Sequence, residues 1–238
     1  MKLYANATSR FTRLPFAVLA LFLAAGSIPA LAERAAERLA QSAEVLKEVM
    51  DAPDKGIPDD LLKSAYCIVI VPGVKKVGFV VGGNYGRGFA VCRKDNRAGW
   101  GAPAAVRIEG GSVGFQIGAS ATDLIMLVME RRGMDGIMSS KFTLGAEAEV
   151  AAGPVGRSST AQTDATMRAK ILSYSRSRGA FAGLALTGAT LRQDQDENKE
   201  MYGKALTTRE ILDGGVKPPS VAVGLLALLN KYSRREGK

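Results

Sequence analysis

The first hydrophobic feature of the chain is an apolar run of 12 residues, Leu14–Ala25. Basic residues precede this run and a small-x-small sequence follows it: Lys2, Arg10, Arg13 and Ala30-Leu31-Ala32. Such flanks are typical of a secretory signal peptide, so residues 1–32 are predicted to be removed and the mature chain to begin at Glu33. The run is shorter than the roughly 20 residues of a spanning helix. A retained membrane anchor is the alternative.

A helical pattern follows the leader. Between Glu33 and Met50, apolar residues recur at three- and four-residue steps while charged residues occupy the other positions. This period predicts an amphipathic helix that ends before Pro53 and Gly56. The sequence Pro58-Asp59-Asp60 then predicts a short second helix, because proline and acidic residues suit a first turn.

The pattern changes to short β runs after the second helix. Runs rich in apolar and β-branched residues predict about nine strands: Tyr66–Val71, Val77–Val81, Gly88–Arg93, Ala104–Glu109, Val113–Ile117, Leu124–Met129, Phe142–Ala151, Ala169–Ser175 and Ala180–Ala189. Turn residues predict connections at Pro72-Gly73, Asp95–Arg97 and Glu109–Ser112. The remaining periodic segments predict helices at Met134–Ser139, Gln193–Tyr202, Thr207–Leu212 and Ser220–Tyr232.

Glycines lie within several of these predicted strands, among them Gly78, Gly86 and Gly88. Strand glycines mark bulges, bends or close backbone approach, so they indicate a strongly coiled sheet. The predicted fold is α+β: a Gly-rich antiparallel sheet, sandwich or barrel, with N- and C-terminal helices. No repeat or linker divides residues 33–238, which are therefore predicted to form a single domain.

The charge of the chain favours an anionic partner. Loss of the predicted leader, which holds three basic residues and no acidic one, lowers the net charge from +9 to +6. A phospholipid surface, an acidic polymer or a nucleic acid would suit this excess. Ordinary globular proteins carry similar charge, which is the alternative. Aromatic residues are not interleaved with the basic pairs, so no nucleic-acid partner is expected.

The chemistry-bearing residues do not predict an enzyme. The chain has no histidine, and its carboxylates lie outside apolar stretches, so we expect no catalytic residue, no metal site and no cofactor. The stretch Gly83–Gly88 lacks the Lys-Ser/Thr of a phosphate-binding loop and is interpreted as a Gly-rich hairpin. Cys67 and Cys92 could form a disulfide if their strands are neighbours, and two buried thiols are the alternative.

Basic residues at the ends of predicted strands are the candidate binding residues. Lys75 and Lys76 have no acidic neighbour between Asp60 and Asp95, and Arg176 and Arg178 have none between Asp164 and Asp194. We expect these four side chains to converge on one rim of the sheet. Solvated charges that serve only solubility are the alternative.

Several short motifs, taken together, resemble the SYLF family. They are Ile70-Val71-Pro72, Gly82–Gly88, Trp100-Gly101-Ala102-Pro103, Gly153–Arg157 and Tyr174–Gly183, the last reading Tyr-Ser-Arg-Ser-Arg-Gly-Ala-Phe-Ala-Gly. They occur in the family's order, and the resemblance covers the chain from about Glu37 to Tyr202. The chain departs from the family at Gly101, usually serine, and at Ala180, usually leucine, which puts in doubt any role for the serine hydroxyl.

The resemblance implies a non-enzymatic lipid-binding domain. Eukaryotic members bind phosphoinositides, partly through an N-terminal amphipathic helix, and fungal members also bind actin. In this chain the matching helix offers Arg34, Arg38 and Lys47, but alternating acids leave it close to neutral.

The expected function is peripheral binding of anionic phospholipid head groups by an exported protein, in the periplasm or at a membrane of a bacterial envelope. A structural or protein-interaction domain without a lipid ligand is the alternative. No protein partner follows from the sequence.

Overall fold

The computed structural model describes residues 30–52, 56–78, 81–94, 99–113, 120–156, 169–177, 180–183, 188–213 and 215–234. The helices are α1 (Ala30–Asp51), α2 (Asp59–Ser64), α3 (Arg131–Ile137), α5 (Gln195–Tyr202), α6 (Thr208–Leu212), the 3-10 turn η1 (Ser220–Ala222) and α7 (Val223–Tyr232). The strands are β1 (Cys67–Gly78), β2 (Val81–Cys92), β3 (Ala104–Val113), β4 (Ser120–Val128), β5 (Lys141–Thr143), β6 (Val150–Ala152), β7 (Ile171–Ser177), β8 (Ala180–Gly183) and β9 (Thr190–Gln193).

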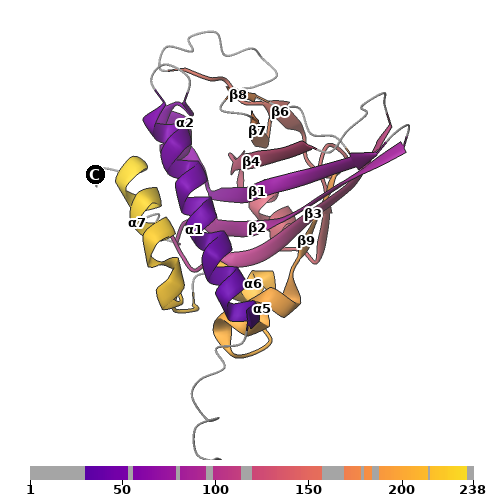
Figure 1. Ribbon diagram of the computed structural model, residues 1–238. Coiled ribbons are helices and arrows are strands. Elements are labelled where there is room, and N and C mark those ends of the chain that lie inside the picture. The colour runs from indigo at the N-terminus through magenta and orange to yellow at the C-terminus, as the bar shows by residue number, and fades with distance from the viewer. Residues whose placement is uncertain are drawn as a thin grey trace, which may run out of the picture.

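The strands of the described residues form one curled sheet, and α1 and α7 lie side by side across one of its faces (Figure 1). The strand order is β5-β9-β3-β2-β1-β4-β7-β6, and β8 pairs with β7. The predicted α+β class and the terminal helices are therefore confirmed. The sheet is mixed instead of purely antiparallel, because β6 runs parallel to β7.

The central strands are buried on both faces, which explains why they read as continuous apolar runs. Along β1, Ile68 and Ile70 pack under α1 and α7, while Cys67, Val69 and Val71 enter a second cluster on the opposite face. That second cluster is closed by residues of α3, β5 and α6. The sheet therefore has one face covered by α1 and α7, called here the α1 face, and one covered by shorter elements.

The turn predicted at Pro72-Gly73 is wrong, because these residues form an irregularity inside β1. The pairing register of β1 shifts here against both β2 and β4. Gly73 has a φ of 57°, and its N–H donates to Asp123 Oδ1 at 2.9 Å. A glycine in the left-handed region bends the strand without ending it, since neighbours on both sides continue to pair.

Two glycine-rich segments predicted as hairpin connections are also wrong, because both are strand interior. Residues 109–112 continue β3 opposite β2, and residues 83–88 lie within β2. A Cβ at Gly110 would lie 3.1 Å from Ala189 Cα, and one at Gly88 would lie 2.0 Å from the Ile70 oxygen. Glycine is needed at these positions for close backbone approach, not for a turn.

One predicted strand is divided in the structure, and another is described as a shorter strand. Residues 142–151 contribute to β5 and β6, which pair with different neighbours, and Gly145 between them has a φ of 83°. Residues 180–189 contain β8, whereas β9 begins only at Thr190. The connection predicted at Asp95–Arg97 and most of the strand predicted at Val113–Ile117 lie outside the described residues.

Candidate functional site

The predicted rim of basic residues is only partly visible in the structure. Lys75 is exposed on β1, opposite Tyr85 of β2 and Ala121 of β4. The backbone of Lys76 belongs to the same strand, but its side chain lies outside the described set, as does Arg178. Among the four predicted rim residues, Lys75 therefore has a described side chain that is exposed to solvent.

Arg176, the other described rim residue, is held by carboxylates that are distant in the sequence. Its Nε lies 3.0 Å from Asp123 Oδ2, and its Nη1 forms an ion pair with Glu48 of α1. Asp123 also accepts from the Gly73 N–H, so the arginine connects α1 to β4 and β1 through this carboxylate. Arg176 therefore has two carboxylate neighbours in the fold, although no acidic residue lies near it in the sequence.

The predicted basic residues of α1 have different surroundings. Lys47 pairs with Asp51 one turn later, at 3.1 Å, and both are exposed. Arg38 is half-buried and forms an ion pair with Glu197 of α5. Arg34 is exposed and, with Arg38, lines a cavity of about 660 Å³ between α1, β2 and α5.

Three of the residues that line the cavity, Arg38, Arg87 and Glu197, belong to a charged cluster that also includes the buried Asp194. Arg87 Nε lies 2.5 Å from Asp194 Oδ2, and Arg87 Nη2 lies 3.4 Å from Glu197 Oε2. Burial raises the pKa of the Glu197 carboxyl, although Arg38 and Arg87 act in the opposite direction. With two guanidinium groups and two carboxylates, the cluster is close to neutral and connects α1 and α5 to the sheet.

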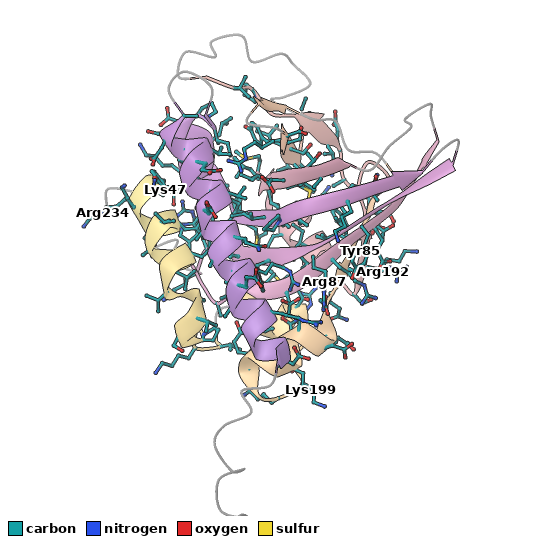
Figure 2. The ribbon with its side chains drawn as sticks, viewed as in Figure 1. Lys47, Tyr85, Arg87, Arg192, Lys199 and Arg234 are labelled. Carbon is teal, nitrogen blue, oxygen red and sulfur yellow. A yellow bond between two sulfur atoms is a disulfide. The ribbon has the colours of Figure 1, made fainter. Side chains whose placement is uncertain are left out.

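A row of basic residues begins at Arg87 of this cluster and crosses the α1 face away from it. Arg87 of β2 lies directly opposite Arg107 of β3, Arg107 lies opposite Arg192 of β9, and Arg192 lies opposite Lys141 of β5. Directly opposite residues point to the same face and are separated by about 5 Å. Figure 2 shows Tyr85, Arg87 and Arg192 on the part of the sheet that α1 leaves uncovered. We call Arg87, Arg107, Arg192 and Lys141 the cation row.

The positive charges of the row have fewer carboxylate partners from β2 toward β5. Arg87 has two carboxylate partners, whereas Arg107 and Arg192 share one, Glu109. Among the described residues, Lys141 has no carboxylate within salt-bridge distance, and its side chain is exposed. Like charges directly opposite one another destabilise a sheet. The excess positive charge therefore lies at the β5 end of the row, where three cations face one carboxylate.

Sequence reasoning missed the cation row. A connection was predicted at Asp95–Arg97, and Arg87 and Arg107 are equally far from residue 97 along the sequence. A hairpin centred on that residue would have placed the two arginines opposite each other, as they are in the structure. Nothing local in the sequence places Arg192 and Lys141 beside them, since β9 and β5 join the sheet through long-range pairing.

The two cysteines are joined by a disulfide in the structure. Cys67 and Cys92 are directly opposite residues of β1 and β2 and are essentially inaccessible. Their pairing is therefore decided by the register of these two central strands.

Two motifs that carry the family resemblance have structural roles. Tyr174 is fully buried beneath α1, and a Cβ at Gly153 would lie 2.0 Å from its ring. Trp100 is buried, its indole N–H donates to Ser233 Oγ at 2.8 Å, and the Arg93 guanidinium stacks 4.3 Å from the ring centroid. Both motifs hold helices against the sheet.

In the part of the chain that the structure describes, no helix combines the length and the apolar character needed to span a bilayer.

Comparison with known proteins relates the chain to several longer proteins of eukaryotes. It is 36% identical over 177 residues to an SH3 domain-containing protein of Schizosaccharomyces pombe, covering 73% of this chain and 41% of that protein. It is 31% identical over 205 residues to the human SH3 domain-containing YSC84-like protein 1, covering 86% and 59%, respectively. The LAS seventeen-binding protein 3 of Saccharomyces cerevisiae is 34% identical over 183 residues, covering 74% and 39%.

The chain thus spans about 40 to 60% of the length of these relatives. The family model described as Ysc84, Las17-binding protein actin regulator, matches residues 109–232. The chain belongs to this Ysc84 family, that of the SYLF domain.

Proposed function

We propose that the chain is a non-enzymatic protein that binds anionic phospholipid head groups at a membrane surface, using the uncovered part of its α1 face. The cation row is the observation that carries this proposal. It aligns four basic side chains across four neighbouring strands, at a cost to sheet stability that an anionic surface would offset.

Residues beside the row support the same assignment. Lys75 and Tyr85 are opposite each other on β1 and β2, and Tyr85 in turn lies opposite Glu109, two residues along the strands from the Arg87–Arg107 pair. Tyr85 is 48% exposed. An exposed tyrosine beside lysines and arginines suits a membrane interface, where an aromatic ring with a polar tip is favoured.

The proposed location is the bacterial envelope, after export. The buried disulfide supports this location, because such bonds persist in oxidising compartments. The signal-peptide hypothesis makes Glu33 the N-terminus of the mature chain, which mass spectrometry of the envelope fraction can read directly.

Sedimentation with lipid vesicles tests the binding function. The chain is expected to bind vesicles that contain phosphatidylglycerol, but not vesicles of phosphatidylcholine alone, and to dissociate at high salt. Because each basic residue near an anionic surface contributes about 1 kcal/mol, Lys75→Ala with Lys141→Ala should weaken binding about 30-fold.

The matched control is Arg131→Ala with Arg132→Ala, which removes the same charge from exposed positions on α3. This helix packs on the other face of the sheet. The control pair should retain most of the binding. Equal weakening by both pairs would show that only net charge matters, and absence of binding by the unmodified chain would refute the function.

Binding to another protein is the second candidate, and the relatives' names favour it. One relative is named for binding LAS seventeen, and the family is described as an actin regulator. The same assay separates the two candidates, since a protein-interaction domain without a lipid ligand would leave both kinds of vesicle unbound.

A further inference from the structure

Glu109 lies between two arginines of the cation row, at the end of the row where carboxylate partners are fewest. Its Oε1 lies 2.7 Å from Arg107 Nε, and its Oε2 lies 3.2 Å from Arg192 Nε. One carboxylate therefore bridges two guanidinium groups that face each other across β3 and β9. Lys141 lies next to Arg192 on β5 and extends the positive charge by one strand.

The bridge is held by charge more than by directed hydrogen bonds. Arg107 Nε and Arg192 Nε are both buried, yet neither makes a hydrogen bond within the described residues, despite their short distances to Glu109. The three side chains remain between 37% and 38% exposed, so an incoming anion can reach them from solvent. An arginine presents five N–H donors in a planar fork, most of which the single carboxylate leaves available.

We propose that Arg107, Arg192 and Lys141 form a binding site for the dianionic phosphate of a phosphomonoester, and that Glu109 occupies this site when no ligand is bound. The inference rests on the proposed function and deepens it, because it names the site and the class of head group. We call these three basic residues, with Glu109, the phosphate seat.

Charge explains why a monoester is preferred to a diester. Arg107 and Arg192 contact the single carboxylate of the seat, and Lys141 lies beside Arg192, so two of the three positive charges are uncompensated. A phosphodiester carries one negative charge and would only replace the one that Glu109 already supplies. Glu109 also competes from within the molecule, at an effective concentration on the order of millimolar or higher. A monoester dianion has a second charge and a third oxygen, so it can contact all three cations.

Threonine hydroxyls adjoin the seat on the same face. Thr190 lies directly opposite Glu109, and Thr143 lies directly opposite Thr190. Both are half-buried, so they border the seat without closing it. Their O–H groups provide neutral donors next to the cationic ones, as is common around bound phosphate.

Two kinds of probe distinguish a lipid source from a soluble one. Vesicles that contain phosphatidate present a phosphomonoester, and vesicles with phosphatidylglycerol at matched charge present a diester. Inorganic phosphate serves as the soluble probe, followed by the NMR signals of the arginine Nε–H groups. We expect about tenfold tighter binding to phosphatidate than to phosphatidylglycerol, and phosphate-dependent shifts of two arginine signals.

Removal of the internal competitor gives the most specific result. Glu109→Gln should strengthen phosphatidate binding about tenfold, whereas the control Glu130→Gln, an exposed acid on the other side of the sheet, should change it much less. Arg107→Lys with Arg192→Lys keeps the charge but removes the forked donors, so it should abolish the preference for the monoester while binding to phosphatidylglycerol persists.

The outcomes separate the seat from the general function. Equal binding to both acidic lipids, with Glu109→Gln no different from Glu130→Gln, would overturn the seat and leave membrane binding intact. Shifts of the arginine signals with inorganic phosphate, but no binding to any vesicle, would support the seat with a soluble ligand and overturn membrane binding. Circular dichroism of each variant confirms that it is folded.

Discussion

The disulfide between Cys67 and Cys92 is expected to contribute a large part of the stability of the domain. The two cysteines are 25 residues apart in the sequence, and a cross-link that closes a loop of that size lowers the entropy of the unfolded chain by an amount worth about 3.5 kcal/mol. Typical domains are stable by about 5 to 15 kcal/mol, so Cys67→Ala with Cys92→Ala should remain folded but with a small margin. For a chain of this size, the expected drop in the unfolding temperature is about 7 to 14 °C.

Urea unfolding of the double variant and of the unmodified chain measures this difference. Because both sulfur atoms are inaccessible, reductant should act on the native protein only through unfolding, so the bond should resist reduction until urea is added. A loss below about 1 kcal/mol would refute the entropic reasoning. It would mean that β1 and β2 already remain paired in the unfolded chain, so that the cross-link restricts little.

Further substitutions test the packing and the charges. Gly88→Ala should destabilise the domain by about 3 kcal/mol or more in urea unfolding, because its Cβ would lie 2.0 Å from the Ile70 oxygen. Gly224→Ala, in open space on α7, should instead stabilise it by about 0.5 to 1 kcal/mol. Arg176→Ala should cost about 1 kcal/mol and leave vesicle binding nearly unchanged, since its charge is already compensated. Burial raises the pKa of Glu197, so the folded state binds its proton more tightly than the unfolded chain does. The unmodified chain should therefore lose stability relative to Glu197→Gln as pH rises above the ordinary pKa of a glutamate carboxyl, and the opposite trend would mean that the two arginines outweigh burial.

Local patterns in the sequence were sufficient for the helices and for most of the strands. The three- and four-residue spacing between Glu33 and Met50 depends only on which side chains can share one face of a helix, and α1 spans this segment. Leu39 and Leu46 from that stripe are fully buried under it. The motifs that resemble the SYLF family could also be recognised in the sequence, and two of their aromatic residues, Trp100 and Tyr174, belong to the cluster between the sheet and the helices.

Glycine was where local reasoning failed. The same residue permits a tight turn and a close approach between strands, and the sequence does not distinguish them. At Gly73 the bend is absorbed within β1 because β2 and β4 continue to pair on either side. At Gly110 the reason for glycine is Ala189, a residue almost eighty positions away.

The candidate site depended on the tertiary structure to a greater extent. The number of basic residues, their excess over acids and the absence of histidine were fully determined by the sequence. The sequence did not determine which of these basic side chains are paired with carboxylates in the fold. Arg176 has no acid nearby in the sequence but meets Asp123 and Glu48 in the fold, whereas Arg107 and Arg192, unremarkable in the sequence, come to share Glu109. An electrostatic contact depends on distance in space, and the pairing of strands distant along the chain decides which charges become neighbours.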